Sequence, residues 1–238
     1  MDSVESALAA ERGGARRLEL CDALFDGGTT PSAGMIAACR HRASIPVFVI
    51  IRPRGGGFVY SAPELDVMRR DIEAARGLGA NGVVLGVLRR DGDIDEQQTR
   101  SLVDAAGDLP VTFHRAFDFA RDPGAAMETV ISAGITRILT SGGAPTAREG
   151  VATLASLVRQ AGDRLVVMAG GGVREENVKA IVAGSGVREV HVRLTRLTRG
   201  DGLPLVPGLK VRKALPGDEA AWEETDEARI RNFVSAAG

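Results

Sequence analysis

Short apolar runs, rich in β-branched residues, recur about every 25 to 35 residues along the chain and limit the folds that it can adopt. Seven runs follow this spacing: RRLELC (16–21), IPVFVII (45–51), GVVLGVL (82–88), PVTFHRA (110–116), TRILTSG (136–142), DRLVVMAG (163–170) and REVHVRL (188–194). The spacing is typical of alternating strands and helices and not of all-β sandwiches. Near-continuous apolar strands predict a parallel sheet that is buried on both faces.

The segments between these runs carry helix signals. They include Pro31 after Thr30, Asp95 before Glu96, Pro123 after Asp122, and a capping box of Thr146 and Glu149. The first helical segment, VESALAAERGG (4–14), precedes the first strand, and the last is GDEAAWEETDEARIRNFVSAAG (217–238). This gives eight helical segments but only seven strands.

A closed (β/α)8 barrel has eight strands and commonly runs to roughly 250 residues. We therefore predict that residues 1–238 form one domain, a TIM-type (β/α)8 barrel that lacks strand 1 at the N-terminus. An open sheet is the alternative. A Rossmann fold is excluded, because the glycines at 170–172 come late in the chain and lack the GxGxxG spacing.

Composition excludes several classes of protein. With 44% hydrophobic and 26% charged residues the chain can bury a core, and a net charge of −1 gives no basic surplus for nucleic acid. No apolar run approaches the roughly 20 residues that cross a bilayer, and no signal peptide is apparent, so a cytoplasmic protein is expected. Two cysteines, Cys21 and Cys39, are too few for a disulfide scaffold.

Polar residues at the carboxyl ends of barrel strands point to function, since the active site lies there. Side chains alternate along a strand, so one face collects a set of polar residues at the mouth of the barrel. The set is Glu19, Cys21, Arg52, His114, His191 and Arg193. The mouth would hold a carboxylate, two imidazoles and two guanidiniums.

Several of these residues suit anion binding and proton transfer. Glu19 needs a nearby arginine if it is buried, and a structural ion pair and a catalytic role are equally open for it. Arg52 and Arg54, in RPRGGGF (52–58), would clamp an anion, although a mobile loop with solvated arginines is the alternative. His114 would transfer a proton, unless it is a core histidine.

Other candidates lie just beyond the strands. Arg115 and Asp118 follow His114, and Asp118 would assist the proton transfer. Two glycine-rich loops, TSGGA (140–144) and AGGGVREEN (169–177), offer backbone N–H groups to a phosphate. Their candidate binding residues are Ser141, Gly142, Gly170 and Gly171. Plain turn chemistry explains such glycines equally well.

No strong metal motif appears. Cu(I) favours thiolate and thioether ligands, and Cys21, His114 and Met168 could meet inside the barrel. Cys39 follows Met35 by four positions on a predicted helix, where the two sulfur side chains are expected to pack together. Only Cys21 is retained as a metal candidate.

Taken together, these motifs resemble the CutC family of copper homeostasis proteins. The resemblance runs from residue 2 to about 192 in uninterrupted order, through ESALAAERGGARRLELCDALFDGGTTPSAGMI, RPRGGGFVYS, VTFHRAFD, RILTSGG, VVMAGGGV and REVHV. It implies a TIM-type barrel, a cytoplasmic location, a homodimer and copper handling, and it brings no firm enzymatic reaction. Family members carry a strand of the type LEVCVDS before VESA, which is absent here, so a two-thiolate Cu(I) site would keep only Cys21.

Three hypotheses of function follow. The first is a copper-binding protein with Cu(I) on Cys21. The second is an enzyme that acts on a small phosphorylated or carboxylated metabolite, with the arginines as the clamp and His114 as the proton-transfer group. The third is a truncated pseudoenzyme that keeps only the scaffold, with unpaired strand edges that favour association or instability. Nucleic acid and membrane are excluded as partners, and copper(I) is the only cofactor suggested.

Overall fold

The computed structural model describes residues 1–200 and 220–238, and its centre is a seven-stranded parallel sheet. The strands are β1 (Leu18–Leu20), β2 (Val47–Ile50), β3 (Gly82–Leu85), β4 (Val111–Phe113), β5 (Arg137–Thr140), β6 (Val166–Ala169) and β7 (Glu189–Val190). Each strand pairs with the next along the chain, from β1 to β7. All seven predicted strands are confirmed, although each is shorter than its apolar run.

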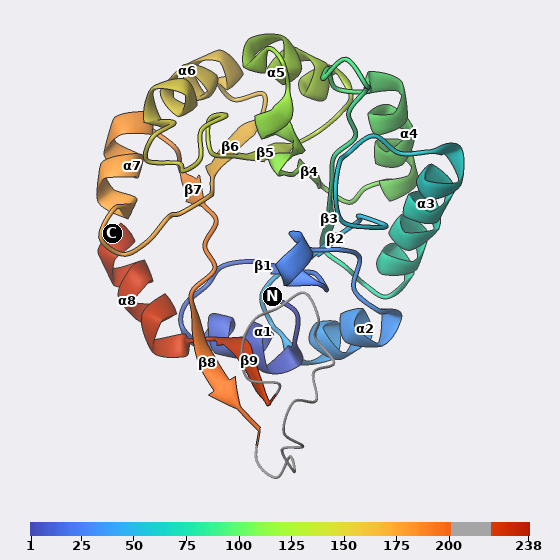
Figure 1. Cartoon of the computed structure of the whole chain (residues 1–238). Helices are drawn as coiled ribbons and strands as arrows, with labels where there is room; N and C mark the ends of the chain where they lie inside the picture. Colours follow the sequence, from blue (N-terminus) through green and yellow to red (C-terminus); the bar gives the residue numbers. More distant parts are fainter. Residues whose placement is uncertain (201–219) are drawn as a thin grey trace, which may run out of the picture.

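Helices surround the strands as an outer ring (Figure 1). They are α1 (Val4–Arg12), α2 (Ala33–Arg42), α3 (Ala62–Gly77), α4 (Glu96–Ala106), α5 (Pro123–Ser132), α6 (Val151–Ala161), α7 (Val178–Ser185) and α8 (Glu227–Ala237). Two 3-10 helices, η1 (Leu24–Asp26) and η2 (Arg115–Phe119), follow β1 and β4. None of these described helices is long and apolar enough to cross a membrane.

The helix ring closes although the sheet does not. Helix α8 packs between α7 and α1, and an ion pair joins Arg12 of α1 to Glu227 of α8. A Cβ atom on Gly13 would lie 2.6 Å from the Ile230 side chain, so this glycine allows the close approach of α1 to α8. The fold is therefore a TIM-type barrel with eight helices around seven strands in the described part of the chain.

Strands β1 and β7 form the two edges of the sheet and do not pair with each other. On the free side of β1, the Met1 nitrogen donates to the Glu19 carbonyl and the Cys21 N–H donates to the Met1 carbonyl, both at 2.9 Å. This is the hydrogen-bond pattern of a parallel bridge. The gap between β1 and β7 thus lies where a closed barrel has its eighth strand.

Alternation along the strands separates an outer and an inner set of side chains. The main apolar core lies between the sheet and the helices, and it contains Leu18, Val49 and Phe113. A small separate cluster of Cys21, Phe48, Ile50 and Val84 belongs to the other face, inside the barrel. The inner face predicted for Cys21 and Phe48 is thereby confirmed.

An ion-pair network joins the two edges of the sheet inside the barrel. Glu189, at the start of β7, accepts hydrogen bonds from two arginines. Arg17, which immediately precedes β1, donates at 2.5 Å, and Arg137 of β5 donates at 2.7 Å. The Phe48 ring lies against both guanidiniums, with its centroid 5.2 Å from Arg17 Cζ and 5.7 Å from Arg137 Cζ. The side chain of Arg17 also donates to Met168 Sδ at 3.3 Å.

Two predictions of secondary structure need correction. The run at 188–194 pairs in the barrel only over Glu189–Val190, and the chain then leaves it as strand β8 (Thr195–Arg199). Within the predicted last helix, residues 221–225 form β9 (Ala221–Thr225), which pairs antiparallel with β8. Backbone pairing with β8 overrides the local helical pattern there. Residues 217–219 lie outside the described residues.

The helix signals are confirmed at two positions and displaced at two. Asp95 caps α4 and Asp122 caps α5, with Pro123 in the first turn. Helix α2 begins two residues after Pro31, with Ser32 as its cap. The Thr146 and Glu149 side chains do bond to each other, but they stand in a turn before α6.

Replacement of Glu189 by glutamine should lower stability at neutral pH by about 1 to 2 kcal/mol, because it leaves two arginines side by side in a half-buried site. Partial burial raises the pKa of Glu189, but hydrogen bonds from Arg17 and Arg137 outweigh it and hold the pKa below the ordinary 4.5. The stabilisation is therefore complete above pH 4.5 and declines as pH falls through the lowered pKa. Urea unfolding at pH 7 and pH 3 should show the difference between wild type and variant shrinking in acid.

The control is Glu128→Gln, which breaks an exposed ion pair with Arg164 on the outer surface. That variant should unfold nearly as the wild type does at both pH values. Equal stability of the Glu189 variant and the wild type at pH 7 would contradict the role of the network.

Candidate functional site

His114 lies buried at the end of β4, with its imidazole inside the barrel. Its Nδ1 accepts a hydrogen bond from the Ala116 N–H at 3.1 Å, so the proton of the neutral ring stands on Nε2. Burial, together with the positive charge of Arg52, lowers the pKa of His114 to about 3. At neutral pH the ring is therefore an uncharged hydrogen-bond donor.

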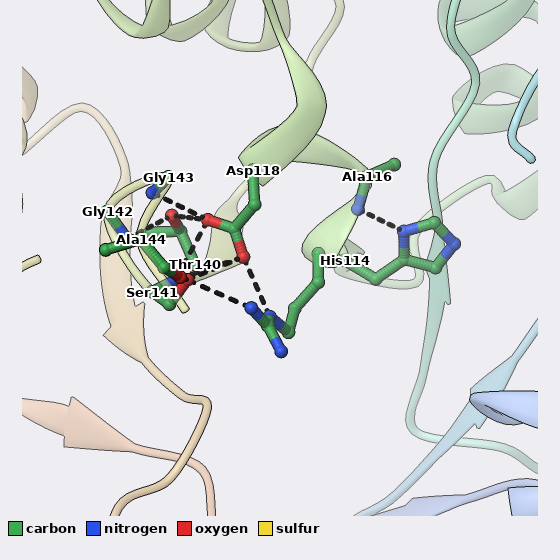
Figure 2. Close-up of polar contacts among 9 residues, drawn as sticks. His114, Ala116, Asp118, Thr140, Ser141, Gly142, Gly143 and Ala144 are labelled. Carbon is green, nitrogen blue, oxygen red and sulfur yellow. Dashed lines mark hydrogen bonds and ion pairs between the residues drawn. The ribbon is translucent and has the colours of Figure 1, made fainter. Parts of the chain in front are cut away.

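Gly86 on the neighbouring strand end makes the space for this ring. A Cβ atom on Gly86 would lie 2.6 Å from both Cε1 and Nδ1 of His114 and 2.9 Å from the Ala116 Cβ. The imidazole therefore lies across the end of β3, on the side toward β2. Figure 2 shows it turned away from Asp118.

Asp118 is buried in a set of hydrogen bonds that the chain itself supplies (Figure 2). Its carboxylate accepts from Thr140 Oγ1 at 2.5 Å, from the Ser141 N–H at 2.9 Å and from the Gly143 N–H at 3.1 Å. Arg115 Nε adds an ion pair at 2.7 Å. A carboxylate with this many donors is held in one position, and few of its lone pairs are left for a ligand.

The N–H groups of the loop after β5 therefore donate to acceptors of the chain itself. The Gly142 N–H donates to Thr140 Oγ1 at 2.9 Å, and Ser141 Oγ bonds to Asp118 and to the Ala144 carbonyl. The N–H groups from Ser141 to Gly143, which the sequence suggested for phosphate, are thus engaged with the Asp118 carboxylate and the Thr140 hydroxyl. The Asp118 carboxylate thus occupies the position that the sequence suggested for a bound phosphate.

The loop after β6 is different, because its N–H groups are free. No described residue accepts a hydrogen bond from the N–H groups of Gly171, Gly172 or Val173. Gly170, by contrast, donates to the Thr140 carbonyl at 2.9 Å. Gly171 has a φ of 95°, and a Cβ atom there would lie 3.3 Å from Arg115 NH1, so this loop passes close to a guanidinium.

Arg115 connects the two loops. Its Nε bonds to Asp118 and its NH2 donates to Ser141 Oγ at 3.0 Å, whereas its NH1 has no partner among the described residues. The side chain is 43% exposed, so solvent reaches it. Arg115 and the 170–173 loop together present one charged donor and several backbone donors at the mouth.

The two arginines after β2 are both engaged with backbone carbonyls of the chain. Arg52 is buried and donates to the carbonyls of Asp26, Gly28 and Gly56 at 2.7 to 2.9 Å. Arg54 donates to three carbonyls of its own loop and pairs with Glu64. Arg54 therefore shapes the loop and does not point into the mouth as a clamp.

Three candidate residues remain: Glu19, His191 and Arg193. Glu19 is half-buried on the edge strand β1, and the arginine partner expected for it is not found among the described side chains. His191 is half-buried after β7. Arg193 is exposed and pairs with Glu223 of β9, which removes it from the mouth, because the chain has left the barrel by that point.

The sulfur atoms proposed as soft ligands have other neighbours in the structure. Burial raises the pKa of the Cys21 thiol, which favours the protonated, weakly binding form. The Met168 sulfur contacts Arg17, and Cys39 packs against Met35 with the two sulfurs 4.0 Å apart, as expected. Within residues 1–200 and 220–238, no three His, Cys, Asp or Glu side chains are grouped to hold a metal ion.

Comparison with known proteins decides the family. Residues 1–195 match the CutC family. The chain belongs to the CutC family. A CutC family protein of Chromobacterium violaceum is 48% identical over 240 residues, which cover 98% of this chain and 94% of that protein. The human copper homeostasis protein cutC homolog is 45% identical over 238 residues, covering 100% of this chain and 87% of its own.

Solved structures agree with this assignment. A candidate copper homeostasis protein CutC from Streptococcus agalactiae superposes with a TM-score of 0.77 at 36% identity, over 80% of this chain and 94% of that one. Phosphoribosylanthranilate isomerase of Thermotoga maritima matches with a TM-score of 0.58 at 16% identity, over 100% of this chain and 94% of that one. The second likeness shows the barrel fold alone.

Sequence reasoning missed several residues of this CutC-family site. Gly86 was not singled out, although it stands where the inner-face alternation of β3 predicts a side chain next to His114. Thr140 and Gly143 were also missed, because only the folded chain brings them to Asp118. A glycine on the inner face at a strand end is the signal that could have pointed to a neighbouring ring.

Substitution of Gly86 by alanine should destabilise the protein by about 1 to 3 kcal/mol, because the new methyl group overlaps the His114 ring. Gly77→Ala in α3 is the matched control, since a Cβ there meets nothing within 4 Å. The control should be neutral or more stable by up to about 1 kcal/mol. Urea unfolding measures both, and equal effects of the two substitutions would contradict the packing.

Proposed function

We propose that this CutC-family chain is an enzyme that binds a small phosphorylated metabolite at the mouth of the barrel, between Arg115 and the 170–173 loop. The observation that carries the proposal is the unpaired NH1 of Arg115 beside free backbone N–H groups at Gly171 and Gly172. Guanidinium and backbone N–H groups are hard donors that match phosphate oxygens. Phosphate sites in barrels of this type are frequently built at the last strands.

The fixed position of Arg115 supports this proposal. Asp118 holds Nε and Ser141 holds NH2, so the guanidinium is oriented before a ligand arrives. Preorganisation lowers the entropy cost of binding. In this arrangement Asp118 is a positioning residue. The backbone N–H groups of Gly171 and its neighbours, more than Ser141 and Gly142, would bind the phosphate.

Inorganic phosphate and a panel of phosphorylated metabolites should raise the melting temperature of the wild type. At ten times Kd the stabilisation is about 1.4 kcal/mol, or about 3 to 5 °C for a chain of this size. Arg115→Gln should abolish the shift, whereas Arg90→Gln, on an exposed loop, should keep it. A shift of the same size in the Arg115 variant would refute this binding position.

Copper handling is the second candidate, and it comes from the names of relatives such as the human homolog. The described residues offer it one buried thiol on the inner face, Cys21. Cu(I) prefers two or more soft ligands, and the sulfur of Met168 is engaged with Arg17. The residues described here therefore fit an anion better than Cu(I).

A direct test uses Cu(I) titration against a competing chelator. If copper is bound through Cys21, Cys21→Ser should lower the affinity at least tenfold, and Cys39→Ser should leave it unchanged. Unchanged Cu(I) affinity in the double variant would exclude a thiol-based site. A cytoplasmic location and assembly as a homodimer remain proposals that rest on the family resemblance.

A further inference from the structure

Arg52 is a buried guanidinium without an anionic partner. It is 5% exposed, and its three hydrogen bonds go to backbone carbonyls. No described carboxylate forms an ion pair with it, and its Nε is buried without a hydrogen-bond partner among the described residues. The Tyr60 hydroxyl, also buried and unsatisfied, lies beside the guanidinium and is uncharged. Buried charges are normally paired, because carbonyl dipoles compensate a full charge only in part.

His114 supplies a second unpaired donor nearby. The ring is 5% exposed, its Nδ1 is engaged by Ala116, and its Nε2 has no partner among the described residues. The Phe58 ring stands next to both groups, with its centroid 5.2 Å from Arg52 Cζ and 5.0 Å from the His114 ring. The influence of Arg52 on the pKa of His114 agrees with this proximity.

We propose that Arg52 Nε and His114 Nε2, beside Phe58, form a binding position for the carboxylate group of a small ligand. The position offers two N–H donors, one of them charged, and it lacks its counter-ion. A carboxylate supplies one negative charge and two acceptor oxygens, which matches this set. A metal cation does not match, since the charge of Arg52 would repel it and the proton on Nε2 would block coordination.

This inference deepens the proposed function and rests on it for one point, that the same ligand carries a phosphate at Arg115 and a carboxylate here. The two positions are separate, because the His114 ring lies against Gly86 while Arg115 reaches Ser141 and Gly171. Each position can therefore be tested with its own simple anion.

Phe58 must move for the carboxylate to enter, since the ring packs on His114. The Phe58 carbonyl is held by the Leu88 N–H at 2.9 Å, and Arg54 bonds to the carbonyls of Gly55, Gly57 and Val59. With the backbone held in this way, rotation of the side chain is the motion expected. Removal of the ring should open the position without removing its donors.

The experiment follows the His114 Nε2 signal by NMR in protein labelled with ¹⁵N-histidine, during titration with sodium acetate and, separately, with inorganic phosphate. Acetate should shift the His114 signal in a saturable manner, and Phe58→Ala should raise the acetate affinity several-fold. His114→Phe lacks that signal, so its acetate binding is followed on the Arg52 Nε signal in protein labelled with ¹⁵N-arginine. It should be about tenfold weaker, the effect of one lost hydrogen bond to a charged group. His41→Phe, on the exposed end of α2, is the control and should bind as the wild type does.

The outcomes separate the two proposals. No acetate-dependent shift of His114, in the wild type and in Phe58→Ala alike, would overturn the carboxylate position. Phosphate binding that survives in Arg115→Gln would overturn the proposed function and leave the acetate result standing. If His114→Phe does not fold, His114→Gln, which keeps an N–H donor near Nε2, replaces it and should retain acetate binding. The wild-type titration decides the matter in either case.

Discussion

The carboxylate of Glu189 joins the two edges of the sheet, and the shape of the barrel depends on this interaction. Strands β1 and β7 share no backbone hydrogen bonds, yet Arg17 beside β1 and Glu189 on β7 form an ion pair, with Arg137 as a second partner. Outside the sheet, α8 packs against α1 and α7 and closes the ring of helices. A barrel with seven strands thus keeps the curvature of one with eight, and the strand ends still converge on one mouth.

Inside that mouth, the pairing of charges decides which groups can meet a ligand. Asp118 neutralises Arg115 in part and engages the N–H groups of the loop after β5. Arg52 receives only carbonyl oxygens. The two arginines therefore differ, because one is oriented by an internal anion at the surface and the other is buried and still lacks an anion. This contrast is the physical basis of the anionic ligand that we propose.

Much of the fold could be predicted from the sequence. The recurrence of apolar runs predicted seven strands in the right order, and alternation within each run placed Cys21, Phe48 and His114 on the inner face. The hairpin of β8 and β9 could not be predicted, since the segment at 221–225 pairs with a strand more than 20 residues earlier in the chain. The local pattern there resembles a helix, and the partner strand decides otherwise.

The family, the barrel and the residue types at the strand ends all follow from the amino-acid sequence. Which of those polar groups keep a free hydrogen-bond donor depends on the folded chain. Asp118 and the 141–143 loop look like a catalytic acid beside a phosphate loop in the sequence, yet in space they satisfy each other. Gly171 and Arg52 keep donors that no acceptor within residues 1–200 and 220–238 satisfies. Hydrogen bonding depends on positions and angles that strands distant in sequence supply, and a one-dimensional pattern does not contain them.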